Sequence, residues 1–97
     1  MFTSKQRSNL KGIAMGIEPI AQIGKGGLSE NFIESVDKAL SAREIVKISV
    51  LQNAAEDPKD LAEGVAEATG SEVVCVIGKK IVLYRKSEKK GVEHIVF

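Results

Sequence analysis

Two runs of β-forming residues near the end of the chain are separated by only two residues, and this arrangement constrains the fold more than any other feature. Residues 72–77 (EVVCVI) and 80–85 (KIVLYR) are rich in Val and Ile, and Gly78-Lys79 lies between them. A two-residue connection that contains glycine is typical of a β-hairpin. The sequence therefore predicts an antiparallel strand pair here.

Three segments upstream of and between the strands carry helix signals. Thr3 and Gln6 fit a capping box, Ser29 can cap a second helix, and Asp57-Pro58 places proline at the first position of a third. Gly16 with Pro19 ends the first helix and Gly70 ends the third. The apolar stripes expected from helical spacing are Leu10, Ile13, Ala14 and Ile17; Leu28, Phe32, Val36, Ala39 and Leu40; and Leu61, Val65 and Ala68.

Two further strands are expected, at residues 20–23 and at residues 44–51 (EIVKISVL), where alternation places Lys47 and Ser49 on the exposed face. Residues 92–97 are expected to add a short edge strand. A strand–helix–strand unit implies a right-handed parallel crossover. The predicted fold is a two-layer α/β domain in the order α-β-α-β-α-β-β, with a four-stranded mixed sheet covered by helices.

The composition favours one globular domain. The chain has 97 residues, of which 43% are apolar and 28% charged. The folded part is expected at about residues 3–86, followed by a basic tail at 87–97. There is no apolar run near the roughly 20 residues that span a bilayer, and the single cysteine, Cys75, excludes an internal disulfide. These features predict a cytoplasmic monomer with no membrane partner.

The net charge of +1 is distributed unevenly along the chain. Residues 1–26 sum to +3, residues 27–72 to −6 and residues 73–97 to +4. Two basic ends that meet in space would form a polyanion-binding face on a near-neutral protein. The acidic middle segment favours an alternative, a protein-interaction module for ribosomal or assembly proteins.

A glycine-rich loop, residues 24–27 (GKGG), lies between a predicted strand and a predicted helix. Backbone N–H groups and a helix N-terminus can face an anion there, and Lys25 adds a positive charge. A GxxG loop of this kind clamps nucleotide backbone in KH-type domains. A tight turn that needs a positive φ would also account for the glycines, so spacing alone leaves both explanations open.

Two nucleotide-binding motifs fail on these residues. A Walker A loop needs Ser or Thr directly after Gly-Lys, but Gly26 follows Lys25, and Lys80 follows Lys79. The dinucleotide fingerprint GxGxxG would need a third glycine at Ser29.

Single reactive residues favour structural roles. His94 lies in the tail, Cys75 lies in a predicted strand, and Tyr84 next to Leu83 is typical of a packing residue. Four aromatic residues in all argue against recognition by base stacking. We therefore expect no catalytic residue, no metal site, no cofactor and no small-molecule substrate. The acids on one face of the third helix are expected to be solvated: Asp60, Glu63 and Glu67.

Eight short segments occur in a characteristic order along the chain: residues 10–14 (LKGIA), 18–20 (EPI), 23–29 (IGKGGLS), 39–40 (AL), 44–48 (EIVKI), 68–70 (ATG), 76–79 (VIGK) and 82–85 (VLYR). Together they resemble the CRM domain (chloroplast RNA splicing and ribosome maturation), and a single domain of this length is similar to the bacterial YhbY-like proteins. The resemblance covers residues 4–86. Met15-Gly16-Ile17 departs from it, because a histidine-containing turn is more usual there.

The resemblance implies a fold similar to the C-terminal domain of a bacterial translation initiation factor. It also implies RNA binding, with rRNA in a precursor of the large ribosomal subunit as the partner. By position, residues 24–27 are the family's GxxG loop, and Arg7 and Lys11 lie in its basic first helix. The full set of expected RNA-binding residues is Lys5, Arg7, Lys11, Gly24, Lys25, Gly26, Gly27, Lys79, Lys80 and Arg85.

Overall fold

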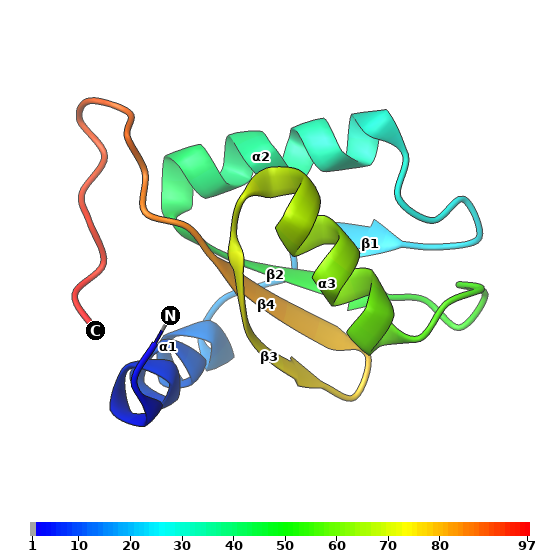
Figure 1. Ribbon diagram of the computed structural model, residues 1–97, viewed down its shortest axis with the longest axis horizontal. Coiled ribbons are helices and arrows are strands. Elements are labelled where there is room, and N and C mark those ends of the chain that lie inside the picture. The colour runs from blue at the N-terminus through cyan, green and yellow to red at the C-terminus, as the bar shows by residue number, and fades with distance from the viewer. Residues whose placement is uncertain (1) are drawn as a thin grey trace.

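The computed structural model describes residues 2–97, and its elements follow the predicted order (Figure 1). The sheet has the strand order β1-β2-β4-β3, in which β1 pairs with β2 in parallel and the other two pairs are antiparallel. The predicted α/β fold with a four-stranded mixed sheet is therefore confirmed. The elements are α1 (Ser4–Met15), β1 (Ala21–Ile23), α2 (Glu30–Arg43), β2 (Ile45–Val50), α3 (Pro58–Thr69), β3 (Glu72–Ile77) and β4 (Lys80–Tyr84).

The helix boundaries follow from local hydrogen bonding, as expected. Thr3 Oγ1 accepts from the Gln6 N–H at 3.1 Å, and Gln6 Oε1 accepts from the Thr3 N–H at 3.0 Å, so the capping box is complete. Ser29 caps α2, and Asp57 caps α3, whose first residue is Pro58. Gly70 ends α3 with a φ of 66°, a conformation that favours glycine. None of the described helices is long and apolar enough to cross a bilayer.

The sheet has helical cover on both faces, one layer more than expected. Helices α2 and α3 bury Val36, Leu40, Leu61 and Val65 against one face and form the main core. Helix α1 lies on the other face, where it forms a second core. The buried residues of this second core are Leu10, Ala14, Ile45, Val74 and Val82.

Two predicted side-chain positions are wrong. Ser49, expected to be exposed, is buried, because Lys80 lies across it and donates a hydrogen bond from Nζ to Ser49 Oγ at 2.7 Å. Ala68, expected in the stripe of α3, is exposed, and Thr69 lies in the core instead. The Thr69 hydroxyl tolerates burial because it donates to the Val65 carbonyl at 2.8 Å.

The predicted edge strand at residues 92–97 is also wrong, since these residues have no regular structure. Instead, Ile95 and Phe97 pack against the second core, and Ser87 is buried. The Phe97 ring meets the rings of Phe2 and Tyr84 at centroid distances of 5.8 and 4.8 Å. The segment after β4 is thus held against the domain, and its end returns to the vicinity of α1 (Figure 1).

Candidate nucleic-acid interface

The loop between β1 and α2 is a tight turn with an exposed tip. The Gly27 N–H donates to the Gly24 carbonyl at 3.1 Å, which places Lys25 and Gly26 at the centre of a β-turn. Both central residues are exposed. Helix α2 begins three residues after Gly27, with Ser29 as its cap. The turn therefore presents a lysine and a bare stretch of backbone just before a helix N-terminus.

The glycines of this turn are not equally required by the fold. Gly27 has a φ of 64°, which favours glycine. Gly26 has no positive φ, and a Cβ built there would meet no described atom within 4 Å. A Cβ at Gly24 would meet Asn53 Oδ1 at 3.4 Å. The need for a positive φ therefore explains the glycine at position 27. It does not explain Gly26, which lies at the exposed tip of the turn, where a Cβ would meet no described atom.

Three connections lie together at one end of the sheet. The Leu51 N–H donates to the Ile23 carbonyl at 2.8 Å, and the Val50 N–H donates to the Lys79 carbonyl at 2.7 Å. Residues 24–28 share a hollow of about 190 Å³ with Ala54–Glu56. The β1–α2 turn, the β2–α3 connection and the β3–β4 turn therefore meet at the end drawn to the right in Figure 1. This places Lys79 and Lys80 at the same end as Lys25.

The strand register places more lysines on the face that α1 partly covers. Ser49 lies opposite both Gln22 and Lys80, and Lys47 lies opposite Val82 of the second core. Side chains of directly opposed residues share a face, so Lys47 and Lys80 point to the side of α1.

Cys75 packs against the second core, close enough to three cations for their charges to act on its thiol. Burial raises the pKa of the Cys75 thiol, while the nearby charges of Lys11, Arg7 and Lys47 act to lower it. The register, which places Lys47 opposite Val82 on the side of α1, identifies Lys47 as a further candidate that the sequence alone does not single out. Its outward position in β2 was the signal, but only the fold places it beside α1.

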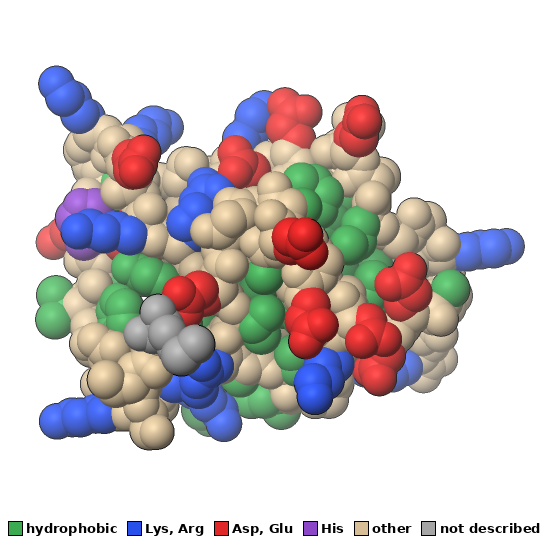
Figure 2. Space-filling view, in the orientation of Figure 1, with side chains coloured by type: hydrophobic (Ala, Val, Ile, Leu, Met, Phe, Trp, Pro, Cys, Tyr) green, Lys and Arg blue, Asp and Glu red, His purple; other side chains and the backbone are tan. Residues whose placement is uncertain are grey.

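Acidic side chains gather on the opposite face. The exposed acids of α2 and α3 lie there, and Figure 2 shows several red side chains over α3. Among the described strand residues on the side of α1, Glu72 is the one acid, and it lies at the other end of the sheet from Lys80. The two helices also carry three exposed bases, Lys38, Arg43 and Lys59, so the net charge on their side of the sheet is negative. The exposed acids of the two helices are Glu30, Glu34, Asp37, Asp60, Glu63 and Glu67.

A model of the CRS1/YhbY (CRM) domain matches residues 2–85. The chain belongs to this family. It is 46% identical over 94 residues to the "Probable RNA-binding protein YqeI" of Bacillus subtilis, across 96% of this chain and 98% of the relative. It is 39% identical over 89 residues to the "Probable RNA-binding protein MJ0652" of Methanocaldococcus jannaschii, across 90% of this chain and 66% of the relative.

The fold agrees with a solved structure. The solution structure of the hypothetical protein SAV1595 from Staphylococcus aureus superposes with a TM-score of 0.78 and 50% sequence identity, covering 96% of this chain and 98% of the other. The two relatives above are named as probable RNA-binding proteins, and CRM-domain proteins of this kind are non-enzymatic.

Arg7 of this CRM domain stabilises the fold through hydrogen bonds to β3, in addition to contributing a positive charge to the surface. Strand β3 has an irregular register between Val73 and Cys75, a β-bulge. Arg7 Nη1 donates to the carbonyls of Val73 and Val74, at 2.9 and 2.5 Å. The Arg7 guanidinium also lies 5.6 Å from the ring centroid of Phe2. Replacing Arg7 would therefore disturb the bulge as well as the charge.

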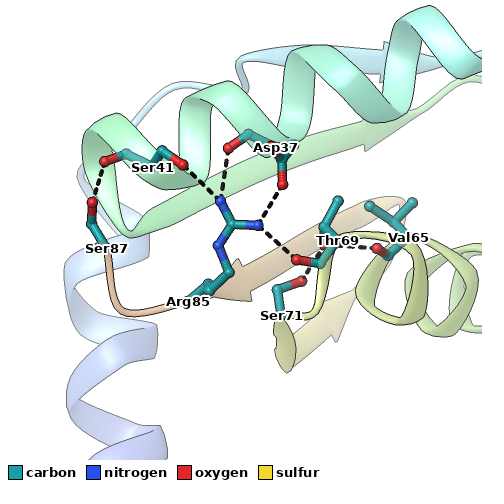
Figure 3. Close-up of polar contacts among 7 residues, drawn as sticks. All are labelled: Asp37, Ser41, Val65, Thr69, Ser71, Arg85 and Ser87. Atoms are coloured by element: carbon teal, nitrogen blue, oxygen red, sulfur yellow. Dashed lines mark hydrogen bonds and ion pairs between the residues drawn. The ribbon is translucent and has the colours of Figure 1, made fainter. Parts of the chain in front are cut away.

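Arg85 is occupied within the protein (Figure 3). Its Nη1 donates to Asp37 Oδ1 and to the Thr69 carbonyl, both at 2.6 Å, and its Nη2 donates to the Asp37 carbonyl and to Ser41 Oγ, both at 2.9 Å. These bonds join the end of β4 to α2 and to the end of α3, on the acidic side of the sheet. We therefore leave Arg85 out of the candidate surface.

The remaining predicted lysines are exposed. Lys5 and Lys11 lie on α1, and Lys11 borders a shallow hollow of about 490 Å³ together with Arg7 and Met15. Lys79 and Lys80 lie at the β3–β4 turn. The candidate surface, called the basic face below, consists of Gly24–Gly27, Lys79, Lys80, Lys47, Arg7 and Lys11.

Proposed function

We propose that this CRM domain binds RNA through the basic face and contacts mainly the phosphate backbone. The observation that supports the proposal best is the separation of charge across the sheet. The cations of the basic face lie on the side of α1 and at the loop end, whereas α2 and α3 on the other side carry six exposed acids and three exposed bases. A polyanion would be attracted to one face and repelled by the other. The names of the relatives agree with this function.

The turn at residues 24–27 would position one stretch of backbone. Its exposed tip lets a phosphodiester approach closely at Gly26, and the N-terminus of α2 behind it favours a negative charge. Lys25 adds a mobile cation. This arrangement binds phosphate without regard to the base attached to it.

Base stacking has little part in the proposal. Phe2, Tyr84 and Phe97 pack edge to face against each other, and Phe32 packs against the main core. These rings are therefore engaged within the protein. We propose that recognition depends on the shape of a folded RNA, and the family resemblance points to rRNA in a precursor of the large ribosomal subunit.

Replacing Lys11 with Ala should weaken RNA binding and reduce its salt dependence without affecting stability. Lys11 is exposed on α1. Removing one lysine that binds a phosphate lowers the slope of log affinity against log salt by about one. The measurement is a titration of the full chain with a large-subunit rRNA fragment at several salt concentrations.

Lys38→Ala is the matched control, because Lys38 is an exposed helical lysine on the acidic side, with its Nζ 3.2 Å from Glu34 Oε1. Equal reductions of affinity in the two variants, or binding that does not respond to salt, would contradict the proposal.

A further inference from the structure

A groove on the acidic side has no role in the proposed RNA binding. It lies between the first half of α3 and β3, has a volume of about 540 Å³, and has an apolar floor with a charged rim. Figure 2 shows hydrophobic side chains exposed beside the acidic ones on this face. The floor consists of Ala62, Val73 and Val76, and the rim includes Asp57, Lys59 and Glu63.

The groove runs along an open strand edge. Among the described strands, β3 is the last of the sheet and pairs only with β4. Arg7 occupies the carbonyls of Val73 and Val74 at the bulge, which blocks strand addition there. From Cys75 to Ile77 no described strand covers the outer side, and Ile77 is 53% exposed. A short extended segment can therefore pair at residues 75–77.

The charge of the rim indicates what kind of segment fits. Among the residues that line the groove, Asp57 and Glu63 are acidic and Lys59 is the single base. Phosphate would be repelled at this rim, whereas lysine and arginine side chains would be attracted. The floor and the rim lie on the same side of β3. An apolar side chain over the floor and cations at the rim must therefore be two residues apart, because side chains at i and i+2 of an extended segment point the same way.

We propose that this groove docks an extended, basic segment of a partner protein, which pairs with β3 at residues 75–77 and inserts an apolar side chain over Ala62 and Val76. The groove and the basic face lie on opposite sides of the sheet. The CRM domain can therefore hold RNA and a basic protein segment at the same time, as an adaptor between them.

The experiment uses the isotope-labelled full chain and the peptide acetyl-TKTVTKT-amide, in which both lysines and the valine lie on one side of an extended segment. Binding is followed by NMR. The amides of residues 75–77 and the methyl groups of Ala62, Val73 and Val76 should shift on titration. Glu63→Lys should weaken binding about five- to tenfold, because it places a cation at the rim. Glu67→Lys is the matched control, since Glu67 is exposed one helical turn further on and does not line the groove. It should change affinity by less than twofold.

Several outcomes would overturn the proposal. These are the absence of shifts at the groove, equal binding of acetyl-TETVTET-amide, and equal effects of the two substitutions. Shifts at the same residues on dilution and concentration of the protein alone would assign the groove to a second copy of the chain. Shifts there on titration with the rRNA fragment would assign it to RNA.

Discussion

Replacing Gly26 with Asp is expected to lower the affinity for RNA about tenfold or more while the free energy of unfolding stays within about 0.5 kcal/mol of its original value. Gly26 lies at the exposed tip of the β1–α2 turn, has no positive φ, and has open space where a Cβ would stand. The fold therefore tolerates the side chain. A carboxylate at this point would repel the phosphate that we place there.

Gly27 supplies the comparison, because its φ of 64° makes the same turn depend on glycine. Gly27→Ala should destabilise the domain by about 1 kcal/mol. Gly26→Ala adds a side chain without a charge, so it should weaken RNA binding less than Gly26→Asp does. Urea unfolding and RNA titration of the three variants check these expectations. A Gly26→Asp protein that is stable and binds RNA as tightly as before would show that the turn does not contact RNA.

Replacing Glu44 with Ala is expected to destabilise the domain by about 3 kcal/mol, because the Glu44 carboxylate is buried and fully used. Its Oε2 accepts from the Ser87 N–H at 2.6 Å and lies 2.6 Å from His94 Nδ1, and its Oε1 accepts from the Ile95 N–H at 2.8 Å. The side chain is 0% exposed. One carboxylate thus fixes the segment after β4 at both its start and its end.

A second substitution at Glu44 distinguishes the effect of backbone strain from the effect of the lost hydrogen bonds. Glu44 has a φ of 66°, which favours glycine. Glu44→Gly relieves that strain and should be more stable than Glu44→Ala by about 1 kcal/mol, but less stable than the original protein. Urea unfolding measures both, and amide exchange should accelerate in residues 87–97. Glu88→Ala is the control, since Glu88 is exposed in the same segment. Unchanged stability in Glu44→Ala would contradict this account.

The same carboxylate gives the stability a pH dependence. Burial alone would raise the pKa of Glu44, but the hydrogen bonds from Ser87, His94 and Ile95 outweigh it and hold the pKa below its ordinary value of 4.5. The contribution to stability is therefore present above 4.5 and is lost as the pH falls through the lower pKa of the folded state. The difference in free energy of unfolding between the original protein and the Glu44→Gln variant should become smaller as the pH is lowered from 7 to 3. A constant difference would show that Glu44 does not titrate in this way.

Local signals were sufficient to predict the elements and their order. The cap residues Thr3, Ser29 and Asp57 each form the expected bonds, and Gly78-Lys79 forms the hairpin turn. These signals act over two to four residues, so they can be recognised in a single sequence.

The remaining features depend on contacts between distant segments. Glu44 is 51 residues from Ile95, and Arg85 is 48 residues from Asp37, so no short pattern reveals either network. The sequence pattern of Lys47 is typical of a solvated strand residue, and only the fold places it on the side of α1. Ser49 was predicted to be exposed because alternation cannot show that a lysine on the next strand covers it.

Photo-crosslinking of the full chain to a thiouridine-substituted fragment of large-subunit rRNA, followed by identification of the crosslinked peptides, tests the basic face most directly. We expect crosslinks in residues 24–27, at Lys79 and Lys80, and at Lys47 and Lys11. Crosslinks concentrated on the exposed sides of α2 and α3, at residues such as Glu34 or Glu63, would contradict the account.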